Sequence, residues 1–264
     1  MRMVTIKTPQ EIQALKTSGR LIGDILRQLG RAARPGVPTA ELDRMAEELI
    51  LEAGGVPAFK GYRSSRHEPP FPTTICASVN EELVHTPASS RVLRDGDILS
   101  IDIGMRYPAK GKGLFTDTAL TVAVGTVSPT ARRLIAATKT SLERGIEQVK
   151  PGNRISDISR AVQRYVEASG FSVIRQLVGH GVGYAVHEEP RIPNFFDPKH
   201  EDLELRPGLV IAIEPMVSAG DYLIKTLDDG WTIVMADGSL SAHFEHTVAV
   251  TENGVEVLTD PSNA

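Results

Sequence analysis

The sequence predicts an α/β fold built from two similar halves, each with two helices followed by strands. LRDGDILSID (93–102) resembles LRPGLVIAIE (205–214), and each segment ends an apolar run with an acidic residue. Upstream, RPGVPTAELDRMAEELILEAGG (34–55) aligns with KPGNRISDISRAVQRYVEASGF (150–171). Apolar residues recur at helical spacing in both of these copies. Because several features match at similar offsets, duplication explains the sequence better than chance.

Two predicted helices in each half follow from local signals. TPQE makes Thr8 the N-cap of the first helix, with proline at its first position and a capping-box glutamate. Ser128 repeats the Ser-Pro half of that signal in the second half. These helices are expected to stop at the two Pro-Gly segments that precede the second helix of each half. The second helices are expected to end at glycines, Gly54 and Gly170.

Four apolar segments rich in β-branched residues are predicted to form strands. They are DILSIDIG (97–104), TALTVAV (118–124), LVIAIEPM (209–216) and HTVAVT (246–251). Each half therefore reads helix, helix, strands. We predict a single domain over residues 1–264, with an internal repeat over approximately 8–125 and 128–253.

Composition excludes several classes of protein. The net charge is −4 and basic residues are scattered, so nothing indicates nucleic-acid binding. No apolar run approaches the ~18 residues of a membrane span, and the N-terminus lacks the apolar region of a signal peptide. A single cysteine, Cys76, excludes internal disulfides and fits a reducing compartment. We expect a soluble, cytoplasmic protein, and a monomer because no heptad pattern is present.

Acidic residues occupy matching positions in the two halves. Asp102 and Glu214 end the matched apolar runs, while Asp117 and Glu245 each stand just ahead of a further apolar strand. A pseudo-symmetric fold would bring these four carboxylates together, where they repel one another unless a cation lies between them. A single acid at a strand end is more often a turn or cap residue, so the prediction depends on the set.

The stretch GHGVGYAVHEEP (179–190) adds two histidines, His180 and His187. Its glycines argue against a helix, and an odd spacing in an extended chain places side chains on opposite faces. The two imidazoles are therefore expected to have different roles. Four carboxylates with His180 exceed the three protein ligands of one catalytic zinc, so we predict two divalent ions with an activated water between them. Oxygen-rich ligands suit Mn, Fe or Co at least as well as Zn.

The segments GHGVGYAVHEEP, AIEPM and SLSAHFEHTVAVT resemble those of type I methionine aminopeptidase, and the resemblance extends over essentially the whole chain. It implies the pita-bread fold, with two pseudo-symmetric halves and an antiparallel sheet flanked by helices. It also implies a catalytic domain that removes the initiator methionine from nascent chains with a small second residue. Their N-termini, and the ribosome as a further candidate, are the partners implied.

Position by position, the resemblance implies the following roles. The metal ligands are Asp102, Asp117, His180, Glu214 and Glu245, with Asp117 and Glu245 bridging two ions that share a hydroxide. His187 lies near the scissile carbonyl, His85 near the scissile nitrogen and free amine, and Glu214 acts as general base. Cys76, Trp231 and Tyr62 form the methionine pocket. A plain buried thiol for Cys76 and core packing for Trp231 are the competing interpretations.

Some segments depart from the family pattern. His85 begins HTPA (85–88) where the family usually has a different turn, and Val186 stands just before His187, where a bulkier residue is frequent. YPAKGKG (107–113) predicts an enlarged exposed hairpin, and RSSRHEPP (63–70) lengthens another loop. Both lengthened segments could alter access to the site or the range of peptides accepted, and neither removes a predicted ligand.

Two other functions stay open. A proline-specific peptidase of the same fold, such as a prolidase or Xaa-Pro aminopeptidase, shares the five ligands but normally carries a large additional N-terminal domain. A non-catalytic binding protein of this fold usually loses metal ligands, and here all five are present.

Overall fold

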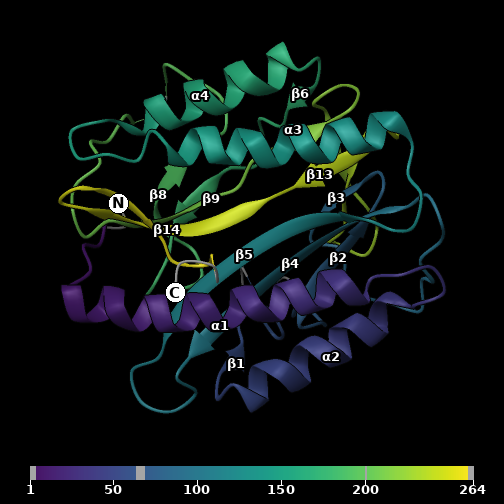
Figure 1. Ribbon diagram of the computed structural model, residues 1–264, viewed down its shortest axis with the longest axis horizontal. Coiled ribbons are helices and arrows are strands. Elements are labelled where there is room, and N and C mark those ends of the chain that lie inside the picture. Colours follow the sequence, from purple (N-terminus) through teal and green to yellow (C-terminus); the bar gives the residue numbers. More distant parts are fainter. Residues whose placement is uncertain (1–3, 64–68, 200, 261–264) are drawn as a thin grey trace.

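The computed structural model describes residues 4–63, 69–199 and 201–260. Four helices and fifteen strands make up this part of the chain, in an order that repeats from one half to the other (Figure 1). The helices are α1 (Pro9–Ala32), α2 (Thr39–Glu52), α3 (Pro129–Ile146) and α4 (Ile155–Ala168). No helix among the described residues is long and apolar enough to cross a membrane.

The predicted starts of α1 and α3 and the predicted ends of α2 and α4 are confirmed. The Glu11 amide donates to Thr8 Oγ1 at 3.3 Å, and the Thr8 amide donates to Glu11 Oε2 at 2.8 Å, which completes the capping box. The Ala131 amide donates to Ser128 Oγ at 3.1 Å at the start of α3. Each cap of this kind stabilises a helix by about 1 kcal/mol. The glycines after α2 and α4 have positive φ, 82° and 80°, as helix-terminating glycines usually do.

The strands form one large and two small sheets, and every pair in them is antiparallel. The first strands are β1 (Val56–Pro57), β2 (Ile75–Val79), β3 (Glu82–Val84), β4 (Ile98–Tyr107), β5 (Leu114–Ala123), β6 (Ser172–Val173), β7 (Gly179–Gly181) and β8 (Glu188–Ile192). The others are β9 (Val210–Ile213), β10 (Met216–Ser218), β11 (Ile224–Thr226), β12 (Ile233–Met235), β13 (Ser241–His243), β14 (Glu245–Thr251) and β15 (Gly254–Val257). The nine-stranded sheet runs β1-β4-β5-β14-β9-β7-β8, with β2 beside β4 and β15 beside β14.

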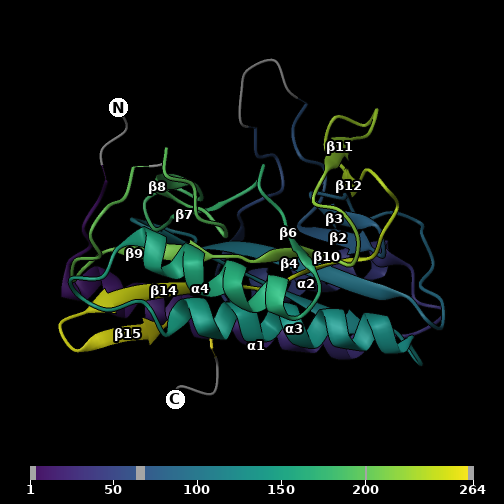
Figure 2. The same cartoon turned by 90° about the horizontal axis from the view of Figure 1, so that it is seen from above.

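Helices cover one face of this sheet and leave the other for the site. Figure 2 shows α1 and α3 along one side of the sheet, and the small sheet strands β11 and β12 toward the opposite side. On β4, alternate residues Leu99, Ile101 and Ile103 are fully buried in the cluster that contains α1 and α2. Because side chains of a strand alternate between faces, Asp102 points away from that core. The predicted α/β fold with an antiparallel sheet flanked by helices is confirmed.

The predicted strand 209–216 is wrong in one respect, because it divides into two strands. β9 ends at Ile213 in the large sheet, and β10 begins at Met216 in a small sheet with β6 and β13. Pro215 lies between them and has no amide hydrogen to donate to a sheet, so the ladder cannot continue through it. Glu214 therefore stands at the junction of two sheets rather than within a strand.

Matching hydrogen bonds recur in the two halves. The Gly36 amide donates to the Leu93 carbonyl at 2.8 Å, and the Gly152 amide donates to the Leu205 carbonyl at 3.1 Å. The first hydrogen bond joins the turn before α2 to the segment before β4. The second joins the turn before α4 to the segment before β9. The two halves also have separate apolar cores, one around α1 and α2 and one around α3 and α4. The domain boundaries stay a prediction, which these repeated contacts support.

The two unusual loops differ in how far they are described. The predicted hairpin at 107–113 is confirmed, because Tyr107 at the end of β4 pairs with Leu114 at the start of β5. The predicted lengthened loop at 63–70 falls mostly on residues 64–68, which lie outside the described residues.

Candidate metal centre and substrate pocket

One cavity of about 380 Å³ gathers every site residue that the sequence predicted. The ten residues come from both halves of the chain. They are Tyr62, Cys76, His85, Asp102, Asp117, His180, His187, Glu214, Trp231 and Glu245. The cavity wall also contains five residues that sequence reasoning missed, namely Phe59, Phe71, Thr226, Gly230 and Ile233.

Strand register brings three of the acids to one face of the large sheet. Ala119 on β5 lies opposite Asp102 on β4 and opposite Glu245 on β14. Residues directly opposite one another in an antiparallel pair share a face. Asp117 lies two residues before Ala119 and so points to that face too. The Thr247 hydroxyl, which donates to the Asp117 carbonyl at 2.8 Å, ties β14 to β5 at this point.

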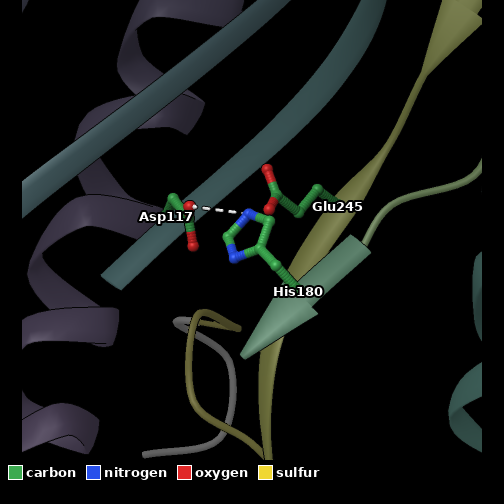
Figure 3. A group of neighbouring side chains, drawn as sticks. All are labelled: Asp117, His180 and Glu245. Carbon is green, nitrogen blue, oxygen red and sulfur yellow. Dashed lines mark ion pairs between the residues drawn. The ribbon is translucent and has the colours of Figure 1, made fainter. Parts of the chain in front are cut away.

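His180 enters the same cluster from β7. One nitrogen or oxygen each from Asp117, His180 and Glu245 all lie within 4.8 Å of one another (Figure 3). His180 Nε2 is 3.6 Å from Asp117 Oδ2 and 3.4 Å from Glu214 Oε1. Among the described residues, no such tight group includes Asp102 or Glu214, although both line the cavity.

Hydrogen bonding fixes the tautomer of His180. Its Nδ1 is 2.9 Å from the Gly181 carbonyl oxygen, which can only accept, so Nδ1 carries the proton. Burial lowers the pKa of His180 to about 4, and the ring is therefore neutral at pH 7. The lone pair of Nε2 then points at the carboxylates, as in histidines that bind metal through one nitrogen and donate with the other.

Without a cation, burial disfavours the charged form of the four carboxylates. Burial raises the pKa of Asp117 to about 6. Burial, followed by the charge of Asp117, also raises the pKa values of Asp102 and Glu245 well above their ordinary range. The pKa of Glu214 is raised in the same way, by burial and then by Asp102 and Asp117.

The residues present fit a divalent metal. Among the described residues that line the cavity, none is lysine or arginine, so no side chain supplies a permanent positive charge. Asp102 Oδ1 is buried and has no hydrogen-bond partner, which is costly for a carboxylate unless something else binds it. A cation would lower the pKa values of all four carboxylates and satisfy the free oxygen. Oxygen donors with one imidazole are a usual ligand set for Mn, Fe, Co or Zn.

His187 reaches the cavity beside the cluster but is not in the tight group. Its ring centroid is 4.5 Å from that of His180, and its Nδ1 is 2.8 Å from the Tyr62 hydroxyl. Burial, followed by the charge of His180, lowers the pKa of His187 to about 3. His85 lines the same cavity with a φ of 59°, and burial lowers its pKa to about 4.

An apolar wall lies next to the acids. Phe59, Phe71, Cys76 and Val186 form a buried cluster, with Tyr62 and Trp231 packed against it. Phe71 and Trp231 meet edge to face, with centroids 5.3 Å apart. Cys76 on β2 lies opposite Asp102 on β4, so the wall adjoins the acids directly. Cys76, Trp231 and Tyr62 thus lie together in this wall, and their role as a methionine pocket stays a prediction. Phe59 and Phe71 could have been found only by noting that aromatic residues flank Tyr62.

His243 is a further residue that sequence reasoning missed. It is buried, its Nε2 is 3.7 Å from Glu214 Oε2, and neither ring nitrogen has a hydrogen-bond partner. The sequence does carry a signal, because His243 precedes Glu245 by two residues and a two-residue spacing in extended chain keeps one face.

Comparison with known proteins agrees with this arrangement. The model of metallopeptidase family M24 matches residues 13–252. Methionine aminopeptidase 1 of Bacillus subtilis is 48% identical over 257 residues, which cover 97% of this chain and 99% of that protein. The crystal structure of methionine aminopeptidase from Thermotoga maritima has a TM-score of 0.90 and 41% identity, covering 98% of this chain and all of that one. The prolidase from Pyrococcus horikoshii is 22% identical with a TM-score of 0.74, and this chain spans 63% of it.

Proposed function

Because the chain belongs to metallopeptidase family M24, we propose that it removes the N-terminal methionine from newly made proteins with a small second residue. One observation carries the proposal: the four carboxylates and His180 line the same cavity as the apolar wall around Cys76. The first group can hold metal, and the second can hold a methionine side chain.

Two divalent ions would be held by five residues, namely Asp102, Asp117, His180, Glu214 and Glu245. The ligands would accept Fe, Mn, Co or Zn. When bound, divalent ions polarise the scissile carbonyl and make water nucleophilic near neutral pH.

His187 is assigned to the scissile carbonyl. Its low pKa keeps the ring neutral at pH 7, so it carries one proton. If the Tyr62 hydroxyl donates to Nδ1, that proton resides on Nε2 and is available to the substrate. A neutral N–H donor of this kind stabilises the negative charge that develops on the carbonyl oxygen.

Glu214 and His85 are assigned to proton transfer and amine binding. The raised pKa of Glu214 suits a carboxylate that takes a proton from water and releases it to the leaving amine. His85 is neutral, because burial lowers its pKa to about 4, so it can accept a hydrogen bond from the substrate amine or donate one to it.

The apolar wall is assigned to the methionine side chain. Aromatic rings such as those of Phe59, Phe71 and Trp231 make favourable contacts with a thioether sulfur.

The proposed substrates are the N-termini of nascent chains. We add to the proposal a cytoplasmic location, a monomeric state and encounter of substrates near the ribosome, to be tested by fractionation, sedimentation and ribosome pelleting.

Substrate selection tests the proposal against the proline-specific alternative. Purified protein reconstituted anaerobically with Fe²⁺ or Mn²⁺ is assayed on Met-Ala-Ser, Leu-Ala-Ser, Ala-Pro-Ala and Gly-Pro. We expect release of methionine from the first peptide alone. Cleavage only before proline would overturn the assignment of the pocket, and no cleavage with metal bound would favour a binding protein.

A further inference from the structure

The first glutamate after His187 has no place in the metal site, yet it is one of the most fully bonded carboxylates in the chain. Glu188 Oε2 accepts from Lys7 Nζ at 2.6 Å and from Thr5 Oγ1 at 2.5 Å. Only 1% of the Lys7 side chain and 8% of the Glu188 side chain are exposed. A buried ion pair therefore joins the N-terminal segment to the start of β8, directly beside His187.

The other oxygen of the same carboxylate closes the loop that carries His187. Glu188 Oε1 accepts from the Ala185 amide at 2.9 Å and also from the Tyr184 amide. The carboxylate thus holds the loop to itself through one oxygen and to the N-terminal segment through the other. Neighbouring side chains in an extended chain point to opposite faces, so Glu188 makes these contacts on the face opposite to His187.

Lys7 is itself fixed in place. Its amide donates to the Gly208 carbonyl at 2.8 Å, and its Nζ lies 4.9 Å from the centroid of the Tyr184 ring. A Cβ on Gly183, whose φ is 140°, would lie 2.5 Å from Lys7 Cε, so the close approach requires glycine. The Gly183 carbonyl in turn accepts from the Phe115 amide at 2.7 Å.

The charges of the pair depend on each other. Burial lowers the pKa of Lys7, and the hydrogen bond from Lys7 to Glu188 opposes that shift. Burial alone would raise the pKa of Glu188, but the bonds from Lys7 and Thr5 outweigh it and hold the pKa below its ordinary value. Removing one partner leaves the other charge buried and unpaired, which is far less favourable than the intact pair.

We propose that Lys7 and Glu188 are positioning residues, which fix the 183–188 loop so that the His187 ring stays between the Tyr62 hydroxyl and His180. The inference rests on the proposed function, because it concerns the placement of a group that acts on the substrate. It explains why a glutamate follows His187, and it gives the N-terminal segment a role in the reaction.

The test compares Glu188→Gln with Glu189→Gln. Glutamine keeps the size of the side chain but leaves Lys7 unpaired, whereas the neighbouring Glu189 has no side-chain bond among those described. We expect kcat/KM on Met-Ala-Ser to fall about 10- to 100-fold for Glu188→Gln, the scale of a misplaced group, and less than about twofold for the control. The bound metal content should be the same in both variants.

A double-mutant cycle separates positioning from a general effect on the fold. In a His187→Ala background, Glu188→Gln should cost no further activity, because the group that it positions is gone. Hydrogen exchange on the metal-free protein supplies a readout besides activity, and the amides of Tyr184 and Ala185 should exchange faster in Glu188→Gln. If Glu188→Gln does not fold, Thr5→Val removes one bond to the same carboxylate and is judged by the same cycle.

Two results would overturn the inference while the wild-type protein is active. One is equal activity of Glu188→Gln and Glu189→Gln. The other is a full additional loss in the His187→Ala background. Failure of the wild-type protein to release methionine would instead overturn the proposed function.

Discussion

His180 and His187 meet edge to face, with ring centroids 4.5 Å apart and an interplanar angle of 78°. They are seven residues apart in sequence, His180 in the middle of β7 and His187 just before β8, and the turn between these strands brings them together. Their surroundings differ, because His180 Nε2 faces carboxylates whereas His187 Nδ1 is bonded to Tyr62. This contrast supports one histidine for metal and one for substrate.

Asp102→Asn is expected to weaken metal binding without unfolding the protein. The amide keeps the shape of the side chain but loses the charge, and its Oδ1 position has no protein partner to compensate. We expect metal affinity to fall about tenfold or more and turnover to fall with it. Metal content after dialysis measures the loss, with Asp24→Asn on the exposed face of α1 as the matched control. Full metal retention by Asp102→Asn would exclude Asp102 as a ligand.

His187→Ala is expected to separate metal binding from turnover. The metal content should equal that of the unaltered protein, because His187 lies outside the tight group of ligand atoms. Turnover should fall by about a hundredfold or more, as for a lost oxyanion donor. Steady-state kinetics and metal analysis on the same sample check both parts. If the substitution strips the metal, the roles of the two histidines are assigned wrongly.

Metal affinity is expected to fall as the pH drops through about 6. Burial raises the pKa of Asp117 to about 6, and a carboxyl that holds a proton cannot act as a ligand. Below that pH each displaced proton should cost about tenfold in affinity per pH unit. His180 adds to this trend only at about pH 4 and below, where its ring becomes protonated and can no longer bind metal. Competition titrations with Mn²⁺ at several pH values measure the slope.

The raised pKa of Asp117 also predicts how the stability of the metal-free protein changes with pH. A folded-state pKa above the unfolded value means that the folded, metal-free chain keeps protons that the unfolded chain has released. The contribution of Asp117 to stability is therefore greatest at low pH and is lost as the pH rises from about 4 to about 6. Added metal should raise the melting temperature most above this range. A larger metal effect at pH 5 than at pH 7 would contradict the assignment.

Cys76 is expected to be inert to alkylation in the folded protein. The thiol is 4% exposed, and burial, followed by the charge of Asp102, raises its pKa well above the ordinary value. The thiolate is the reactive form, so iodoacetamide should modify it at least about a hundredfold more slowly in buffer than in denaturant. Mass spectrometry over time gives both rates, and rapid modification of the folded protein would show that the pocket opens.

Local signals predicted much of the fold. The caps at Thr8 and Ser128 depend only on neighbouring residues, so they could be read directly from the sequence. The repeat placed the acids at matching positions of the two halves, although it could not give the strand register. The break at Pro215 was missed although proline within a strand is itself a signal, because the apolar residues on both sides suggested one continuous strand.

The candidate site was predicted unevenly for similar reasons. Charged groups such as Asp117 stand out in apolar strands, whereas Phe59 and Phe71 look like ordinary core residues until the fold brings them to the cavity. His243 was passed over because its proximity to Glu214 comes from the pairing of β10 with β13, which no local pattern reveals. The pair of Lys7 and Glu188 is separated by most of the chain, and no local pattern connects them.

The most direct test of the account is methionine release from Met-Ala-Ser by the Mn²⁺-loaded protein, compared with Glu245→Ala prepared in the same way. We expect the unaltered protein to release methionine and Glu245→Ala to lose at least about a hundredfold in turnover, together with bound metal. Undiminished release by Glu245→Ala, or release that survives complete removal of metal, would contradict a reaction that depends on this cluster of carboxylates.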